Sequence, residues 1–223
     1  MKLLYELIRV VIGGGCRLVF RVRVRGREHV PASGVYIVAP SHRSILDVPF
    51  VTSITRRRIR FMAKRELFTT RIGRLLFTAL GAIEVDRGVT DRAALRASQA
   101  ALEAGEPVGI FPEGTRQSGG MLGELFDGVA YLALKLGVPI VPVGIGGSEE
   151  ILASGKLVPR PHRVVVVVGA PVVPQPDHTA RRRSDVTKMT EELRVRLQAC
   201  LDDARSAAGV VDTGLVGQRR ERE

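Results

Sequence analysis

The stretch Pro40-Ser-His-Arg-Ser-Ile-Leu-Asp-Val-Pro49 decides how the surrounding chain folds. It follows an apolar run, residues 35–39, that is typical of a buried strand. Pro49 fits only the first turn of the helix that comes next, because a proline further along lacks the amide donor and clashes with the preceding turn. The sequence therefore predicts a strand, a loop that holds His42, and a helix with Asp47 near its N-cap.

His42 and Asp47 are five positions apart, so a contact between them depends on the shape of the loop. In a regular helix, residues at this spacing point about 140° away from each other. The two side chains therefore meet only if the loop folds His42 back onto Asp47. An imidazole held by a carboxylate accepts a proton near neutral pH and suits a general base. The alternative interpretation is an N-cap aspartate beside an unrelated loop histidine.

The composition favours an anionic partner. The chain has 223 residues, enough for one α/β domain with its own core, and a formal net charge of +11. Of its 34 basic residues, 29 are arginines, which match phosphate and carboxylate groups with paired donors. Nucleic acid, a lipid surface or a phosphorylated substrate would fit. The two cysteines, Cys16 and Cys200, are far apart, which argues against a structural metal site or a disulfide framework and is consistent with a reducing compartment.

The N-terminal segment is apolar but interrupted by charges. Glu6, Arg9 and the glycines at 13–15 leave no uncharged span of about 20 residues. Leucines at positions such as 3, 4 and 7 recur at helical spacing, so we predict that residues 1–20 form a membrane-associating helix in the plane of the interface. An ordinary packing helix also fits. A secretory signal fits poorly, because Glu6 and Arg9 lie inside its apolar region.

The rest of the chain alternates between strand and helix patterns. Strands are expected at residues 18–25, 59–63, within 81–87, and at 107–111, 139–145 and 164–168; helices are expected up to residue 55 and at 66–80, 90–103, 129–136 and 184–204. This alternation predicts a single α/β domain over residues 21–205, with a mostly parallel mixed sheet flanked by helices, and a flexible C-terminal tail over 206–223. Pro142 inside a strand calls for a sheet edge or a bulge. Helix 66–80 combines arginines with bulky apolar residues, which fits an interfacial helix or a core helix with solvated arginines.

Three strand exits carry polar groups that can converge at one edge of such a sheet. They are His42 with Asp47, Arg87, and the run Glu113-Gly-Thr-Arg116. Glycine at 114 lets the backbone approach a ligand closely, and Arg116 offers a forked donor for phosphate oxygens. Taken alone, the run 113–116 also fits a turn with a salt bridge.

Four blocks, in this order, resemble the 1-acylglycerol-3-phosphate acyltransferases and their glycerolipid acyltransferase relatives. The blocks are His-x4-Asp at 42–47, Gly-x5-Arg at 81–87, Phe-Pro-Glu-Gly-Thr-Arg at 111–116 and Val-Pro-Ile-Val-Pro-Val at 138–143, and the resemblance covers residues 25–170. It implies that His42 is the catalytic base and Asp47 its partner. It also implies a substrate-binding site lined by Lys64, Arg87, Glu113, Gly114, Thr115 and Arg116.

The same resemblance implies a reaction. An acyl chain would pass from acyl-coenzyme A or acyl carrier protein to the free hydroxyl of lysophosphatidic acid, giving phosphatidic acid in phospholipid biosynthesis. No cofactor is expected beyond the acyl co-substrate, and the sequence shows no cluster of metal ligands. Because the acceptor and product are lipids, we expect a peripheral, monotopic protein on the cytoplasmic face of the cell membrane, where acyl thioesters are made.

Two departures from the family pattern bear on the acceptor. Ser41 stands where the family often has Asn, and Asp127-Gly128 stands where many members carry Lys-Gly. Loss of that cation keeps glycerol-3-phosphate, a lysophospholipid or a glycolipid open as alternative acceptors. An alternative of another class is a basic nucleic-acid-binding protein. Aromatic residues make up only 4% of the chain and Trp is absent, so we expect no nucleic-acid partner.

Overall fold

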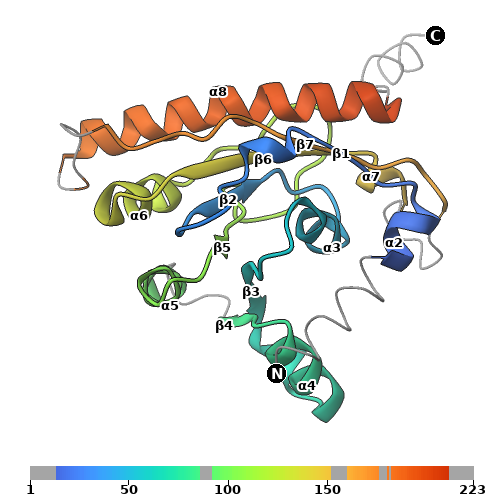
Figure 1. The fold of residues 1–223 in the computed structure, drawn as a ribbon, viewed down its shortest axis with the longest axis horizontal. Coiled ribbons are helices and arrows are strands. Elements are labelled where there is room, and N and C mark those ends of the chain that lie inside the picture. Colours follow the sequence, from blue (N-terminus) through green and yellow to red (C-terminus); the bar gives the residue numbers. More distant parts are fainter. Residues whose placement is uncertain (1–13, 86–91, 152–159, 176–179, 181, 211–223) are drawn as a thin grey trace, which may run out of the picture.

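A seven-stranded mixed sheet forms the centre of the computed structural model (Figure 1). The structure describes residues 14–85, 92–151, 160–175, 180 and 182–210. The strands are β1 (Arg23–Arg25), β2 (Ile37–Pro40), β3 (Arg60–Lys64), β4 (Ile83–Val85), β5 (Val108–Gly109), β6 (Ile140–Gly146) and β7 (Val165–Val168). Their order across the sheet is β1-β7-β6-β2-β5-β3-β4, and among these strands only the β6–β7 pair is antiparallel. The prediction of a mostly parallel α/β sheet is confirmed.

Helices cover both faces of this sheet. They are α2 (Gly14–Val19), α3 (Asp47–Val51), α4 (Arg71–Ala79), α5 (Arg92–Glu103), α6 (Gly128–Leu136), α7 (Ser148–Ile151) and α8 (Arg183–Ala208), with 3-10 turns η2 (Arg27–His29), η3 (Thr52–Ile54) and η4 (Arg65–Phe68). Helix α8 runs along one face, α3 lies on the other, and α4 projects beyond the edge formed by β4 (Figure 1).

Successive side chains of β2, and of Tyr36 just before it, point to opposite faces of the sheet, and both faces are buried. Ile37 and Ala39 belong to the core cluster that includes residues of α5, α6 and α8. Tyr36 and Val38 belong to the cluster on the other face, with Phe50 of α3. Strands buried on both faces need side chains of this kind at every position. The five valines at 164–168 follow the same rule, and all five are buried as predicted.

Helix α8 lies directly against β6. A Cβ atom on Gly144 would lie 2.1 Å from the Cys200 carbonyl oxygen, so only glycine permits this approach. Burial raises the pKa of the Cys200 thiol to about 11, so this sulfur stays protonated at neutral pH. The helix ends at Ala208, beyond the domain end predicted at residue 205. The first residues of the predicted tail are therefore helical, and residues 211–223 lie outside the described part.

Pro142 lies in an interior strand, so of the two predicted alternatives, a sheet edge or a bulge, the edge is not the one found. It has Ala39 of β2 on one side and β7 on the other. Between the bridge Ile140↔Val172 and the pair Val143↔Val168, two residues of β6 face three residues of the neighbouring segment. This is a β-bulge, and the Pro142 carbonyl accepts the Gly169 amide there at 2.9 Å. Proline has no amide hydrogen to donate, and at this point the β6–β7 ladder is interrupted. The predicted bulge is therefore present.

The helix predicted over residues 66–80 is interrupted. The 3-10 turn η4 ends at Phe68, and α4 begins at Arg71. Between them Thr70 is extended, and its hydroxyl accepts the Gly73 amide at 3.0 Å as the N-cap of a new helix. A local side-chain cap therefore divides a segment whose apolar pattern alone suggested one helix.

Two boundaries near the N-terminus also differ from the prediction. The strand expected over 18–25 is confined to β1, because Leu18 belongs to α2 and the chain turns at Arg21, whose φ is 47°. Helix α3 ends at Val51 and continues only as a 3-10 turn. The interfacial helix predicted over 1–20 falls mostly outside the described residues, which begin with α2 at Gly14. No helix in the described ranges has both the length and the hydropathy that a bilayer-spanning segment needs.

Candidate active site

The loop that holds His42 starts from a fixed point at the carboxyl end of β2. The Ser41 amide donates to the Val143 carbonyl at 2.9 Å, and the Ser41 hydroxyl accepts the Ile145 amide at 3.1 Å. Both partners lie in β6. Ser41 therefore extends the β2–β6 pairing by one residue before the chain leaves the sheet, and His42 follows at the edge where parallel strands place their functional groups.

The loop folds His42 back onto Asp47. His42 Nδ1 lies 2.9 Å from Asp47 Oδ2, and the same oxygen accepts the amides of Arg43 at 2.6 Å and Ser44 at 2.7 Å. The other oxygen, Oδ1, accepts the Ser148 hydroxyl at 2.6 Å. Asp47 is fully buried and is the first residue of α3, with Leu46 at the N-cap position. The carboxylate therefore serves the loop and the imidazole, and the contact between the two residues is confirmed.

These contacts determine which nitrogen of His42 is available. An ionised carboxylate only accepts hydrogen bonds, so Nδ1 carries the proton in the contact with Asp47. The lone pair is then on Nε2. The His42 side chain is 19% exposed, whereas that of Asp47 has no exposure. Phe111 stacks on the imidazole with ring centroids 4.0 Å apart. The arrangement suits a general base, because the partly accessible imidazole is oriented on one edge by a buried carboxylate and on one face by an aromatic ring.

The run Glu113-Gly-Thr-Arg116 follows β5, the neighbour of β2, and reaches the same site. It divides into a buried and an exposed part. Glu113 is buried and accepts the His42 amide at 2.9 Å, while Gly114, Thr115 and Arg116 are exposed. Gly114 has a φ of +65°, and a Cβ atom there would lie 2.8 Å from the Phe126 ring, so the turn requires glycine. The predicted convergence of these two strand exits is therefore observed.

The remaining predicted site residues are placed less fully. Lys64 is the last residue of β3, which pairs with β5, so its backbone lies at the same edge of the sheet. Arg87 lies outside the described residues. Arg116 makes no hydrogen bond or ion pair from its side chain within the described part of the chain, which leaves its guanidinium available to a ligand.

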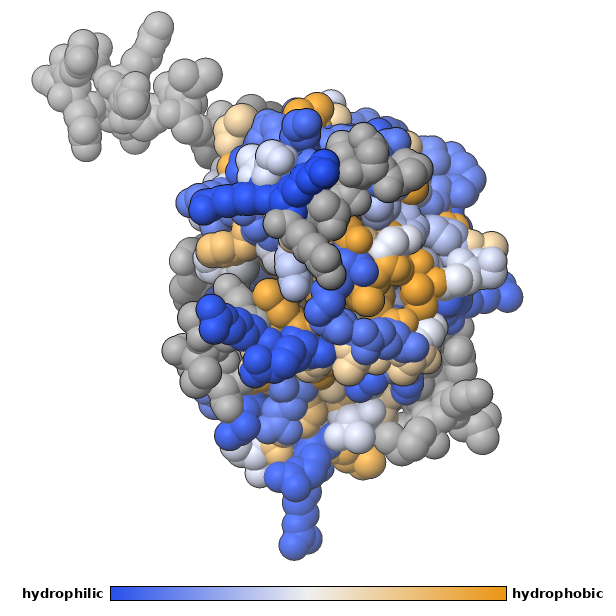
Figure 2. Space-filling model, turned by 90° about the vertical axis from the view of Figure 1, so that its left-hand side faces the viewer, coloured by the Kyte–Doolittle hydropathy of each residue, from blue (hydrophilic) through white to orange (hydrophobic). Residues whose placement is uncertain are grey.

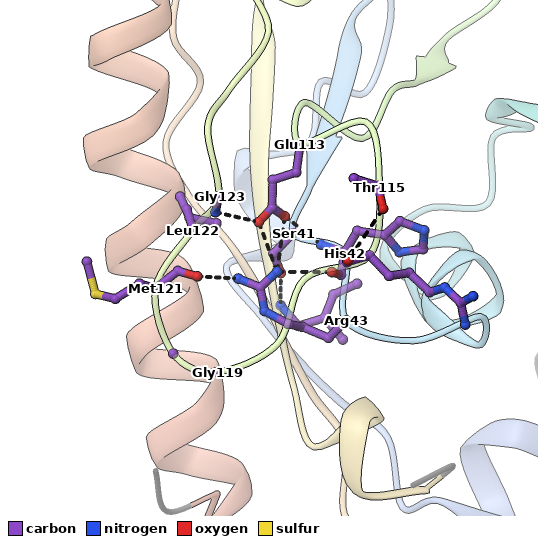
Figure 3. Close-up of polar contacts among 12 residues, drawn as sticks. Ser41, His42, Arg43, Glu113, Thr115, Gly119, Met121, Leu122 and Gly123 are labelled. Carbon is purple, nitrogen blue, oxygen red and sulfur yellow. Dashed lines mark hydrogen bonds and ion pairs between the residues drawn. The ribbon is translucent and has the colours of Figure 1, made fainter. Parts of the chain in front are cut away.

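Two residues at the site were missed by the sequence analysis. Arg43 forms a buried ion pair with Glu113, at 2.9 Å (Figure 3). Ser148 begins α7 directly after β6 and bonds Asp47. Both have a weak sequence signal. Arg43 lies inside the His-x4-Asp block, and Ser148 follows a strand exit, but nothing local indicates their partners.

A second, partly buried ion pair lies close to the Asp47 carboxylate. Arg205 of α8 binds Glu149, which follows Ser148, at 2.5 Å. Burial raises the pKa of the Glu149 carboxyl, and the negative charge of Asp47 adds to the rise, while Arg205 and Arg43 oppose it. Across the described residues, no three His, Cys, Asp or Glu side chains lie close enough together to hold a metal ion.

The Asp127-Gly128 departure has a structural role. The Asp127 carboxylate accepts the Thr190 hydroxyl of α8 at 2.7 Å, directly before the start of α6. A lysine cannot accept this bond. The aspartate thus connects α6 to α8.

Comparison with known proteins identifies the family. Residues 21–146 match the family model described as Acyltransferase. The chain belongs to the acyltransferase family. It is 36% identical over 133 residues to human 1-acyl-sn-glycerol-3-phosphate acyltransferase alpha, a match that covers 58% of this chain and 47% of the relative. The chain thus spans about half the length of the mammalian relatives that it matches.

Bacterial members of the family match over more of their length. The 1-acyl-sn-glycerol-3-phosphate acyltransferase of Bacillus subtilis is 30% identical over 179 residues, which cover 79% of this chain and 86% of the relative. The crystal structure of the 1-acyl-sn-glycerophosphate (LPA) acyltransferase PlsC from Thermotoga maritima superposes with a TM-score of 0.71 at 26% identity. That superposition covers 89% of this chain and 80% of the other. The resemblance to the 1-acylglycerol-3-phosphate acyltransferases is therefore confirmed.

We expect Ser148→Ala to lower the free energy of unfolding by about 1–3 kcal/mol, because the variant leaves Oδ1 of a buried carboxylate without its donor. Ser98→Ala is the matched control. Ser98 is equally buried, but its hydroxyl has no hydrogen-bond partner in the described structure, so its loss should be neutral or stabilising. Urea denaturation of both variants measures the difference. Equal stabilities would show that the Ser148 bond to Asp47 contributes nothing.

Proposed function

We propose that this chain is a 1-acylglycerol-3-phosphate O-acyltransferase. It transfers an acyl group from acyl-coenzyme A or acyl carrier protein to the free hydroxyl of lysophosphatidic acid and so makes phosphatidic acid. The observation that carries the proposal is the 2.9 Å contact between a partly accessible His42 and a fully buried Asp47. The names of the relatives support the choice of acceptor.

In the proposed mechanism, His42 Nε2 takes the proton of the acceptor hydroxyl. The oxygen attacks the thioester carbonyl carbon, the carbon–sulfur bond breaks, and the imidazolium returns the proton to the leaving thiolate. Asp47 holds the imidazole in the required tautomer and stabilises its cation. No side chain of the enzyme is acylated, and the protonated Cys200 on α8 takes no part. Base catalysis of this kind contributes about 10²–10⁴-fold, and positioning of the substrates adds more.

Arg116 is proposed to bind the phosphate of the acceptor. It is exposed, it follows β5 at the edge of the sheet where His42 lies, and its guanidinium matches two phosphate oxygens. The Gln117 amide next to it donates to the His42 carbonyl at 2.9 Å, which ties this loop to the base. Lys64 and Arg87 are proposed to add positive charge to the same site.

We also propose that α4 contacts the membrane. Ile72 is 81% exposed and Leu75 is 61% exposed, and Arg71 and Arg74 are exposed on the same short helix. Hydrophobic and strongly hydrophilic side chains lie side by side at the lower end of the view in Figure 2, the end at which α4 lies in Figure 1. Apolar groups beside arginines suit the boundary between acyl chains and anionic head groups. We assign this contact to the cytoplasmic leaflet, where acyl thioesters are made.

Acceptor-dependent release of thiol from acyl-coenzyme A tests the reaction. His42→Ala should lower kcat by at least about 10³-fold, and Asp47→Asn by less, because the base remains but loses its orientation. Circular dichroism checks that both variants fold. Near-normal turnover in a folded His42→Ala protein would contradict the mechanism. Binding of duplex DNA without thiol release would support the nucleic-acid alternative.

Arg116→Lys tests phosphate recognition, because it keeps the charge and removes the fork of donors. The KM for lysophosphatidic acid should rise about tenfold, with the KM for acyl-coenzyme A changed less than about twofold. Initial rates measured with each substrate varied in turn separate the two constants. A rise in the donor KM alone would show that this loop binds the thioester instead.

The double variant Ile72→Ser/Leu75→Ser tests the membrane contact. Burial of one such side chain contributes about 1.5–3 kcal/mol, so binding to anionic liposomes should weaken at least tenfold. Turnover of a detergent-dispersed acceptor should be unchanged. Val195→Ser is the control, because Val195 is 62% exposed on α8, on the opposite side of the molecule from α4. Liposome co-sedimentation measures the effect, and an equal loss in the control would exclude a specific role for α4.

A further inference from the structure

We infer that Arg43 and Glu113 form a buried clamp that positions His42, and that Glu113 does not contact the acceptor. The inference builds on the proposed function, because it concerns how the base of that reaction is held. It separates Glu113 from the exposed residues that follow it in the same run, Gly114, Thr115 and Arg116.

Glu113 uses its carboxylate entirely within the protein. Its Oε2 accepts the His42 amide at 2.9 Å, and its Oε1 accepts the Gly123 amide at 3.0 Å. The Arg43 guanidinium nitrogen Nη1 donates to Oε1 at 2.9 Å and to Oε2 at 3.2 Å. The side chains of Arg43 and Glu113 both have no solvent exposure. With its lone pairs occupied and no exposed surface, Glu113 offers nothing to a substrate in this structure.

Arg43 connects His42, Asp47 and the segment 119–123. Its backbone amide donates to Asp47 Oδ2 at 2.6 Å, and its Nη1 donates to the His42 carbonyl at 3.0 Å. Its Nη2 donates to the Met121 carbonyl at 3.1 Å. Figure 3 shows the guanidinium enclosed between the His42 loop, Glu113 and the segment 119–123. One residue thus binds both members of the catalytic pair and the segment 119–123.

The segment 119–123 is fixed in turn to α8. Side chains of the helix donate to the carbonyls of Gly119, Gly120 and Gly123, and one also accepts the Leu122 amide; these side chains are Arg194, Gln198 and Arg205. A continuous chain of hydrogen bonds therefore connects α8 to the His42 loop. It runs from α8 to the segment 119–123, and from there through the Arg43–Glu113 ion pair to the loop.

The pair is better suited to setting geometry than to adding stability. Burying two charges is costly, and apolar replacements of such pairs are often as stable. Arg43 Nε, moreover, is a buried donor without a partner among the described residues. What an apolar pair cannot reproduce is the set of directed bonds to the His42 and Gly123 amides and to the His42 and Met121 carbonyls. A lysine cannot supply the planar fork either.

Glu113→Gln tests the clamp in the 223-residue chain. We expect kcat to fall about 10–100-fold, because a displacement of about 1 Å at a reacting group has this effect. The KM for lysophosphatidic acid should change less than about twofold. The control is Glu106→Gln. Glu106 forms a partly exposed ion pair with Arg58 and Arg60 at the amino ends of β3 and β5, away from His42, and its loss should leave kcat unchanged. A tenfold rise in the acceptor KM with kcat intact would overturn the inference, because Glu113 would then bind the acceptor.

The double variant Arg43→Met/Glu113→Leu separates positioning from stability. The double variant should have a higher midpoint of thermal unfolding than either single variant, because neither charge is left buried without its partner. Its kcat should stay as low as that of Glu113→Gln. It also serves if a single variant fails to fold. Recovery of kcat together with the unfolding midpoint would show that the pair only fills the interior, and would overturn the inference.

Amide hydrogen exchange tests the clamp without any substrate. Glu113→Gln should speed exchange in peptides covering residues 42–47 and 119–123, and Glu106→Gln should not. Unchanged exchange in both peptides would overturn the clamp. If the wild-type protein fails to acylate lysophosphatidic acid, the proposed function fails, but this measurement still decides whether Arg43 and Glu113 hold the loop.

Discussion

The buried Asp47 carboxylate is the constraint on which the rest of the site depends. A charge without solvent must receive hydrogen bonds from the protein, and here the donors are two loop amides, the His42 ring and the Ser148 hydroxyl. The amides of Arg43 and Ser44 can point at one oxygen only if the loop curls around it, and this curl brings the imidazole back onto the same oxygen. The demand for burial with full hydrogen bonding therefore produces the orientation that a general base needs.

The sheet makes this arrangement possible. Because β2 lies between β5 and β6, the loop after β2 has a strand exit on either side. One neighbour supplies Ser148 to Asp47, and the other supplies Phe111 to the imidazole face and Glu113 to the His42 amide. Segments distant in sequence thus meet at a single edge, as ligand sites of parallel sheets do. Hydrogen bonds from α8 to the segment 119–123 hold that segment against the Arg43–Glu113 ion pair.

Much of this could be predicted from the sequence, for an identifiable reason. Strands buried on both faces must be apolar at every position, so β2 and β7 were visible as runs, and strand exits in parallel sheets converge, which brought His42 and Glu113 together. The features that were misjudged or left open depend on local or distant partners. Thr70 divides one apolar pattern into two elements by capping the second. At Pro142 the pattern left an edge and a bulge open, and the choice between them depends on a segment about 30 residues later. Arg43 and Ser148 find their partners 70 and 101 residues away, and no local pattern encodes such a pairing.

The count of arginines does not show which of them can bind an anionic partner. A net charge of +11 suggested an anionic partner, but several guanidiniums are already used by the protein. Arg43 and Arg205 are buried against carboxylates, and Arg58 and Arg60 share Glu106. The exposed Arg116 at a strand exit, and Arg71 and Arg74 on a helix with exposed apolar side chains, are different in kind. An arginine that is buried against a carboxylate holds a geometry, whereas an exposed guanidinium such as that of Arg116 can present the fork of donors that a phosphate requires. Burial, which the count of charges does not reveal, therefore decides which arginines can meet an anionic lipid.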